Sequence, residues 1–585
     1  MKNILKKIGT CAVAALLGVS AVSFAGCSDE NANKTTISIH YYNGGLGSDW
    51  IREVIAEFEE MFADVSFEEG KTGVHVALTP DKNFNETPTS MMTGAEKADI
   101  LYTADSGIVS YLTTENIFYD ATDIALDKVY DENGNVQLAA DGKSFVQQEY
   151  SMYDRMHPYY QSAYNLAGTR YDTENDDGYY FPLLPYEDTL SGIVIDYDLY
   201  SQLCKDYGLD SEMTGYLFEG DDVRMPGTWD EFFELLTTIR DQADGTYSGF
   251  TYAIDYYTPA LQNAVIADVD GTDEGVENKS EYSGIRMYDT YDGAYDFDGD
   301  GTKETTITAD NAYMLTQTRG YEAMTEIAFR LFESNASGGN IFDNNVMQNP
   351  SYSVAQMDFV MSKTSSTNPR ILAIFEGDWW ENEARASFDS MGAINAEDGY
   401  GKRTFRMMPV PHMTSEEVEE GKTYKVGGFS SGYPIVLNQK TLGNDEAKAQ
   451  VAKLWIQFQH SVQSMQTFTR WSGSVLPYIY EVTDDVKEQM TPFAQSILEI
   501  QMQDRAADGQ IEIVRRNQFT MDDEVRTTSN TIDFRAQFRS WNLTNGAIIA
   551  NMVNLRNPAN NFNWRSSDIA DMVEEYMEGM LTAHQ

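Results

Sequence analysis

Residues 35–102 alternate between two hydrophobic periods, and this alternation constrains the fold more than any other feature of the sequence. Segments 35–41 and 74–78 carry apolar side chains at every second position, as strands do, whereas the apolar residues of 50–62 recur at helical spacing. A third short apolar run covers 98–102. A strand, a helix and further strands in this order predict a parallel sheet covered by helices, so we expect an α/β fold.

The same alternation continues along the chain. Segments 192–196 and 249–254 read as strands, and 446–458 reads as a helix. Thr228 followed by Glu231 predicts the start of a helix, because the pair forms a capping box. Residues 125–180 are polar and rich in turn formers, which indicates a surface insertion. A chain of 585 residues is too long for one hydrophobic core, so we expect at least two large lobes.

The N-terminus has the features of a secretory signal. Lys2, Lys6 and Lys7 precede an uncharged apolar run over 11–24, and the small residues 25–26 lead directly into Cys27. This end of the run resembles the lipobox of bacterial lipoproteins, which implies cleavage before Cys27 and lipidation of its thiol. We therefore expect a signal peptide over 1–26 and a lipidated linker over 27–34. The alternative is an uncleaved membrane-spanning anchor, for which the run is near the lower limit of length.

Charge and cysteine content narrow the class of ligand. The formal net charge is −51, from 41 Lys and Arg against 92 Asp and Glu. Such a surface repels nucleic acid and anionic lipid and favours a neutral or cationic ligand. The cysteines are Cys11 in the signal, Cys27 and Cys204, so no intrachain disulfide forms if Cys27 is acylated. The 36 tyrosines and 8 tryptophans suit the binding of sugars or peptides.

A binding site is expected where the parallel strands end. In open α/β sheets, ligands bind beyond the carboxyl ends of the strands. This rule nominates Tyr42 and Asn43 after the first strand, and Tyr102 and Asp105 at the end of the third. Tyr256 has the same position after the strand 249–254.

The order of motifs resembles that of extracellular solute-binding lipoproteins of carbohydrate ABC transporters, family 1, which includes maltose-binding protein. After the lipobox come Ala-Asp-Ile-Leu-Tyr at 98–102, Phe-Pro-Leu-Leu-Pro at 181–185 and Pro-Gly-Thr-Trp-Asp-Glu-Phe at 226–232. Phe-Glu-Gly-Asp-Trp-Trp follows at 375–380, and Gly-Gly-Phe-Ser-Ser-Gly-Tyr at 427–433. The resemblance covers most of 35–480. The chain is longer than a typical member, with insertions near 125–180 and 265–310 and a tail from about 485.

The resemblance implies a two-lobe fold like that of periplasmic binding proteins, with parallel-rich sheets, a crossover hinge and a central ligand cleft. The first lobe would comprise 35–188 plus 408–465, and the second 189–407 plus 466–585. The implied protein is a monomeric, lipid-anchored receptor on the outer face of the cell membrane. It would bind an oligosaccharide, deliver it to the permease subunits of an ABC importer, and have no catalytic residues or catalytic cofactor. A secreted glycoside hydrolase and a peptide-binding lipoprotein are the alternatives.

The resemblance also adds ligand-binding residues. Its Gly-x-Trp segment places a tryptophan at the cleft and matches Gly377 to Trp379. Because adjacent side chains cannot face the same way, one of Trp379 and Trp380 is expected to stack on a sugar and the other to pack in the core. The remaining candidates contribute hydroxyl acceptors, aromatic faces or groups near the return to the first lobe: Glu187, Asp188, Phe429, Ser430 and Trp471.

An acidic loop predicts a structural metal site. Asp296, Asp298 and Asp300 alternate before Gly301, as in the first half of an EF-hand loop, and such hard oxygen ligands suit Ca²⁺. The terminal glutamate of a full loop would fall at position 307, which is isoleucine, so Glu304 would close a shortened loop. The alternative is an acidic turn between two strands.

Overall fold

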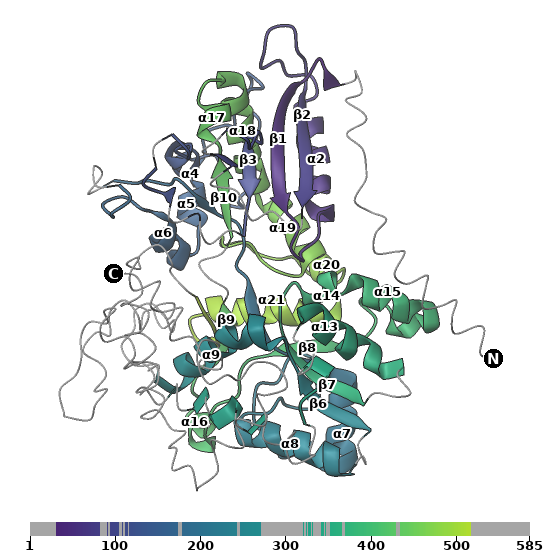
Figure 1. The fold of residues 1–585 in the computed structure, drawn as a ribbon. Coiled ribbons are helices and arrows are strands. Elements are labelled where there is room, and N and C mark those ends of the chain that lie inside the picture. The colour runs from purple at the N-terminus through teal and green to yellow at the C-terminus, as the bar shows by residue number, and fades with distance from the viewer. Residues whose placement is uncertain are drawn as a thin grey trace, which may run out of the picture.

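The computed structural model describes residues 31–81, 94–104, 116–172, 178–242, 246–270, 351–364, 369–428 and 433–515, with short pieces at 90–91, 108, 111–114 and in parts of 320–346 (Figure 1). The signal peptide with Cys27 lies outside the described residues. So do Asp105, Phe429, Ser430 and the four predicted calcium ligands Asp296, Asp298, Asp300 and Glu304. The backbone of Tyr256 is described, but its side chain is not.

The first lobe is built on a five-stranded sheet with the order β2-β1-β3-β10-β4. As predicted, β1 runs parallel to both β2 and β3, with Ile39 opposite Leu78 on one side and Ile100 on the other. Strand β10 returns from far along the chain and pairs antiparallel with β3 and β4. The strands are β1 (Thr35–Tyr42), β2 (Val74–Asp81), β3 (Ile100–Tyr102), β4 (Leu184–Pro185) and β10 (Pro434–Leu437).

Helices cover this sheet, and α2 follows the predicted amphipathic pattern. Its residues Trp50, Val54 and Phe58 are fully buried, and Phe58 meets Trp455 of α18 edge to face at 5.4 Å. The insertion 125–180 contains short helices of its own. The helices of the first lobe are α2 (Asp49–Met61), α4 (Thr122–Leu126), α5 (Met152–Arg155), α6 (Pro158–Tyr164), α17 (Gln439–Leu442), α18 (Glu446–Gln459) and α19 (Val462–Ser472).

The second lobe has a sheet with the order β11-β9-β5-β7-β6, and β8 also pairs with β5. This sheet is mixed, because β5 runs antiparallel to β7, β8 and β9, while β6 with β7 and β11 with β9 are parallel. Its strands are β5 (Leu190–Asp196), β6 (Tyr247–Thr251), β7 (Arg370–Gly377), β8 (Phe405–Met408), β9 (Tyr424–Gly428) and β11 (Ile511–Val514).

The helices of the second lobe include the predicted capped helix α8. The Thr228 hydroxyl accepts from the Glu231 amide at 3.1 Å, and Trp229 is buried as a core residue. Helix α9 begins at Ile254, so Tyr256 lies in its first turn and not in the loop that the sequence predicted. The helices are α7 (Tyr197–Tyr207), α8 (Trp229–Gln242), α9 (Ile254–Asp270), α13 (Tyr352–Met361), α14 (Trp380–Glu383), α15 (Arg385–Ile394), α16 (Ser415–Glu419) and α21 (Pro492–Arg505). Helix α20 (Asp484–Lys487) lies in the connection between α19 and α21 and packs on α19.

The described residues cross between the lobes three times, which makes the fold a two-lobe α/β structure with a hinge. The crossings run from β4 to β5, from β9 to β10, and from α19 to α21 (Figure 1). The first crossing lies between Pro185, which ends β4, and Leu190, which begins β5. The return lies later than the expected 408, because β8 and β9 are strands of the second sheet. Likewise the first lobe includes all of α19, which packs on α2 beyond the expected boundary at 465.

Two further observations concern the described part of the chain. Cys204 is a free, buried thiol in α7. None of the described helices has both the length and the hydrophobicity needed to span a bilayer.

Candidate functional site

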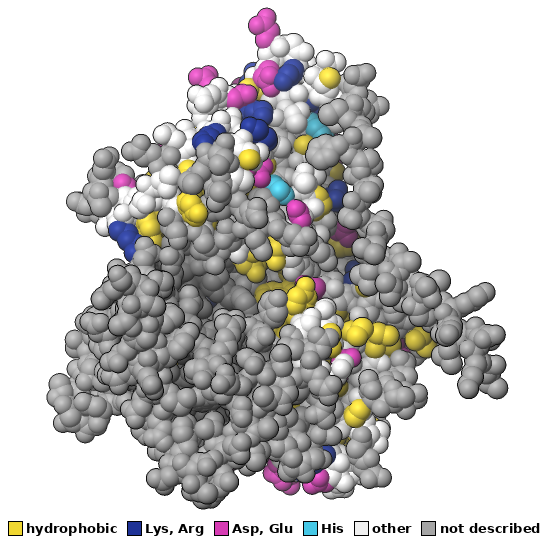
Figure 2. All heavy atoms as spheres, in the orientation of Figure 1, with side chains coloured by type: hydrophobic (Ala, Val, Ile, Leu, Met, Phe, Trp, Pro, Cys, Tyr) yellow, Lys and Arg dark blue, Asp and Glu magenta, His cyan; other side chains and the backbone are white. Residues whose placement is uncertain are grey.

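The ends of β1 and β7 meet where the two lobes face each other. Tyr42 ends β1, and the loop after it brings Gly45 against Trp379, which follows β7 in the second lobe. A Cβ on Gly45 would lie 2.7 Å from the Cβ of Trp379, and Gly45 has a φ of +143°, so only glycine fits there. Figure 2 shows hydrophobic side chains gathered at the level where the upper and lower parts of the molecule meet. This junction is the candidate site.

The structure places the two tryptophans in different surroundings. Trp380 is fully buried in the second lobe, with its ring 5.0 Å from Phe405 and 5.3 Å from Phe493. Trp379 lies over Gly377, where a Cβ would come within 2.4 Å of its ring, and it is 8% exposed. Trp379 is therefore the tryptophan at the junction, and Trp380 is a core residue.

Two tyrosines form the first-lobe side of the junction. The rings of Tyr42 and Tyr433 meet edge to face at 5.8 Å, and both residues are half-buried. Burial raises the pKa of both phenols, and the nearby carboxylate of Glu187 raises them further. We call Tyr42, Glu187, Asp378, Trp379, Glu383 and Tyr433 the interlobe cluster.

Two carboxyl groups of the cluster come from opposite sides of the junction. Glu187 lies in the first crossing and is 4% exposed, and Asp378 follows β7 and is 2% exposed. Burial raises the pKa of Asp378 to about 7. Burial, and then the charge of Asp378, raise the pKa of Glu187 well above its usual range. Both carboxyls therefore lie in a site that disfavours negative charge.

Further polar groups line the second-lobe side. The Gln356 amide donates to Glu376 Oε1 at 3.0 Å and to Glu383 Oε2 at 2.7 Å, which links β7 to α14. Burial raises the pKa of Glu376 to about 8. The Tyr257 hydroxyl interacts with both Glu376 and Trp379. The wall thus offers amide, carboxyl and phenol groups next to an indole, which are the groups that bind hydroxyls and the apolar face of a sugar ring.

Asp188 is placed differently from its predicted role as a hydroxyl acceptor. Arg515 donates to both of its oxygens at 2.8 Å, the Tyr160 hydroxyl donates at 2.8 Å, and Arg505 lies 3.5 Å away. These charges hold the pKa of Asp188 well below its usual range, despite its burial. Arg515 also contacts Asp504 at 2.6 Å. Asp188 therefore ties the first crossing to α21 and β11, and its oxygens are already occupied.

Of the remaining described candidates, Tyr102 and Trp471 lie away from the cluster, and Asn43 directly follows Tyr42 of the cluster. Tyr102 has no exposed surface, because its ring packs between Tyr41 and Tyr186 and its hydroxyl bonds to Gln459. Trp471 lies on the surface of α19, 40% exposed, and donates to Glu53 at 2.9 Å. Asn43 follows β1 and donates its amide to the Asp81 carbonyl at 2.9 Å.

Sequence reasoning missed Asp378 and Glu383 as site residues. Asp378 is the middle residue of the Gly-x-Trp segment, so it lay inside a motif that had been singled out. The signal that was available is its position in the sequence directly before Trp379, which was chosen. Glu383 gave no comparable signal.

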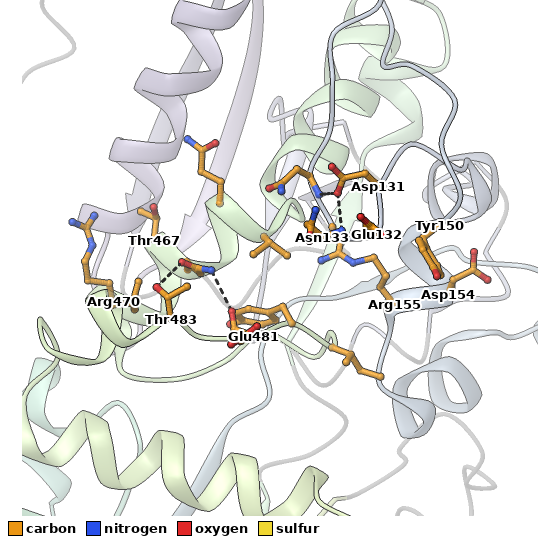
Figure 3. A pocket seen from close by; sticks show the side chains of 18 of the residues that line it. Asp131, Glu132, Asn133, Tyr150, Asp154, Arg155, Thr467, Arg470, Glu481 and Thr483 are labelled. Carbon is orange, nitrogen blue, oxygen red and sulfur yellow. Dashed lines mark hydrogen bonds between the residues drawn. The ribbon is translucent and has the colours of Figure 1, made fainter.

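A separate cavity of about 850 Å³ lies beside the third crossing (Figure 3). Its walls are the loop 131–135, α5, α19 and the segment 479–489, and it shares no residue with the interlobe cluster. Both arginines of its wall are engaged, because Arg470 pairs with Glu53 at 2.5 Å and Arg155 donates to the His460 carbonyl at 2.9 Å. Its volume suits a ligand, but Tyr150 is the one exposed aromatic ring along its wall, so we assign the site to the cluster.

One group of potential metal ligands occurs among the described residues, formed by Asp268, His412 and Glu417. His412 Nδ1 lies 2.7 Å from Asp268, and its Nε2 lies 3.0 Å from the Lys422 carbonyl. The Lys422 ammonium bonds to Glu417 at 2.7 Å and to the Asp268 carbonyl. Lys422 thus supplies the positive charge that a metal would bring, and both imidazole nitrogens are engaged.

No protein-family model and no curated protein matches the sequence. Several solved structures are similar in their chain path. Apo RafE from Streptococcus pneumoniae is 13% identical over 90% of this chain and 98% of its own, with a TM-score of 0.47. Maltose-bound MalE3 from T. maritima is 13% identical over 93% of this chain and 100% of its own, with a TM-score of 0.48. A chitin oligosaccharide binding protein is 12% identical over 94% and 99%, with a TM-score of 0.48.

Proposed function

We propose that this protein binds an oligosaccharide between its two lobes, outside the cell, and presents it to the permease of an ABC importer. The observation that carries the proposal is the position of Trp379, which lies at the lobe junction directly against Gly45 of the opposite lobe. An indole held between two lobes that three crossings connect can stack on a sugar ring when the lobes close. The motif order of the sequence supports the same function.

The proposed mechanism is capture by closure. The pyranose ring stacks on Trp379, its hydroxyls bond to the phenols of Tyr42 and Tyr433 and to the carboxyls of the cluster, and the lobes then close around it. Burying hydroxyls is costly unless each finds a partner, so these polar groups set specificity. No covalent bond forms or breaks. The charge network of Asp188 would keep the crossings in register while the lobes move.

Two further parts of the proposal, the lipid anchor and the metal site, rest on the sequence alone. Lipidated Cys27 would hold the receptor on the outer face of the membrane, where tethering raises its effective concentration at the permease. Export of a Cys27→Ser variant into the medium, with loss of incorporated labelled palmitate, is the expected result. The loop 296–304 would bind structural Ca²⁺, so adding Ca²⁺ to EDTA-treated protein is expected to raise the melting temperature, and Asp298→Asn to abolish that rise.

Calorimetry with a panel of oligosaccharides tests the proposed function. A ligand at about 100 times its dissociation constant stabilises the native state by about 2.7 kcal/mol, which gives a clear upward melting shift. Trp379→Ala is expected to remove most of this shift while the unliganded protein still melts cooperatively. Binding of peptides and of no saccharide would overturn the proposal.

Hydrolysis is the second candidate function, because the structure holds buried carboxyls with raised pKa values, as a general acid requires. Glu187, Glu376 and Asp378 are its candidate residues. Chromatography of each oligosaccharide after prolonged incubation with the protein separates the two functions. Release of shorter products by the wild type, but not by Glu376→Gln or Asp378→Asn, would replace the receptor with a glycoside hydrolase.

A further inference from the structure

Glu187 and Asp378 form a buried pair of carboxyls with no cationic partner among the described residues. Neither oxygen of Asp378 accepts a hydrogen bond, although the Ser474 hydroxyl and the Leu190 amide lie beside it without reaching hydrogen-bond geometry. The charge of Asp378 acts on Glu187 from across the lobe junction. In the described part of the chain, no Lys or Arg forms an ion pair with either carboxyl.

The neighbouring residue shows how this chain neutralises a buried structural carboxylate. Asp188 is as buried as Glu187, at 1%, and it is held by Arg515 and Arg505. A buried carboxylate without a counter-charge costs several kcal/mol, so such groups take up a proton or pair with a cation. The contrast shows that the described residues supply no counter-charge to Glu187 and Asp378, so a cation bound there would come from outside the protein.

The surroundings of the pair restrict what that cation is. Trp379 follows Asp378 directly, and the rings of Tyr42 and Tyr433 lie on the opposite side of the junction. Aromatic faces attract an organic ammonium group. Ca²⁺ instead takes six to eight carboxylate, carbonyl and water oxygens, whereas two carboxyls and two phenols present at most six oxygens and an indole lies among them. The net charge of −51 would also attract a cationic ligand to the molecule.

We infer that the saccharide bound at the interlobe cluster carries a free, protonated amino group, which Glu187 and Asp378 hold from opposite lobes. This inference rests on the proposed function and names its substrate class: amino sugars whose amine is not acylated. The ammonium group has three donors, enough to bridge two carboxyls, while the ring carbons stack on Trp379. Closure of the lobes then brings the two carboxyls together only when the charge between them is present.

Matched ligands that differ only at carbon 2 test the inference. For both the gluco and the galacto series, the full-length mature protein is titrated calorimetrically with the amino sugar, its N-acetyl form and the plain sugar, as monosaccharides and as oligomers. The amine form is expected to bind at least 10-fold more tightly than both neutral forms. Asp378→Asn and Glu187→Gln are each expected to reduce that preference to 3-fold or less.

Glu381→Gln is the matched control variant. Glu381 is also a buried carboxyl, at 3% exposure, but its Oε2 bonds to Thr491 within the second lobe. Its replacement is expected to leave the preference for the amine intact. Binding of a neutral saccharide with no gain from the amine would overturn the inference and leave the proposed function standing. Binding of Ca²⁺ that Asp378→Asn abolishes would overturn it in favour of a metal, and binding of no saccharide at all would overturn both proposals.

Discussion

Glu187 and Asp188 are neighbours in the first crossing, equally buried, and yet their surroundings are opposite. Asp188 accepts from Arg515 and Tyr160 and has a pKa well below its usual range. Burial, and then the charge of Asp378, raise the pKa of Glu187 well above its usual range. The carboxylate of Asp188 is therefore neutralised by arginines at the hinge. The carboxyl of Glu187 has no counter-charge among the described residues and lies between the lobes.

The comparison teaches that burial alone does not assign a role to a carboxyl group. Both residues are buried carboxyls, but removing their charges is expected to change the free energy of unfolding in opposite directions. Loss of the Asp188 charge leaves Arg515 with Asp504 alone and removes the counter-charge near Arg505, whereas loss of the Glu187 charge removes a repulsion. Stability measurements on isosteric variants can therefore separate a structural residue from one that awaits a ligand.

The largest expected effect is that of Asp188→Asn. It leaves the buried guanidinium of Arg515 with only Asp504 as a counter-charge while Arg505 lies nearby, and breaking a buried ion pair in this way costs about 3–5 kcal/mol. Urea unfolding followed by tyrosine and tryptophan fluorescence measures the change in the free energy of unfolding.

Glu187→Gln is the matched control for Asp188→Asn, since it makes the same chemical change one residue earlier. At neutral pH it is expected to leave the free energy of unfolding unchanged or to raise it. Equal losses in the two variants would contradict the division of the crossing into a hinge side and a ligand side.

The second effect is a pH dependence of stability. The folded protein holds the proton of Asp378 up to about pH 7, whereas the unfolded chain releases it near 3.8. The folded state therefore binds more protons in that window, so this group's contribution to stability falls as the pH rises from 3.8 to about 7. Asp378→Asn is expected to be more stable than the wild type by about 4 kcal/mol at slightly alkaline pH, and the difference is expected to vanish in acid.

Melting temperatures of the wild type and of Asp378→Asn across the pH range check this prediction. Asp188 contributes with the opposite sign, because its lowered pKa stabilises the fold at neutral pH and this stabilisation is lost on acidification below its ordinary pKa. A difference between wild type and Asp378→Asn that grows in acid would mean that Asp378 has a cationic partner.

The sequence predicted local features of this comparison well and long-range ones poorly. The β1-α2-β2 opening was readable because its periodicity is local, and the division between Trp379 and Trp380 followed from adjacent side chains pointing apart. The role of Asp188 could not be read, because its partner Arg515 lies 327 residues away. Tyr102 was misplaced for a similar reason, since the tyrosine and tryptophan rings that bury it come from 186 and 455.

The third expected effect concerns the contact between the lobes. Gly45→Ala would place a methyl group 2.7 Å from Trp379 Cβ, and this clash is expected to weaken saccharide binding about 10-fold, or about 1.4 kcal/mol, by opposing closure. Gly47→Ala is the matched control: Gly47 also has a positive φ, +79°, but a Cβ there meets nothing within 4 Å. Calorimetric affinity and the radius of gyration from X-ray scattering measure both variants. Equal weakening by the two would attribute the effect to backbone strain in the loop.

The smallest expected effect is that of Trp471→Ala, which tests whether the ligand site is confined to the interlobe cluster. Trp471 is 40% exposed on α19, and its one described hydrogen bond is to Glu53 on the wall of the separate cavity. Surface substitutions of this kind change the free energy of unfolding by about 0.5 kcal/mol or less, and no change in saccharide affinity is expected. A loss of affinity comparable with that of Trp379→Ala would instead extend the site from the interlobe cluster across α19 to the cavity. The preference for an amine would then have to be explained by Glu53 and the other acids of the cavity wall, and the contrast between Glu187 and Asp188 would describe the hinge alone.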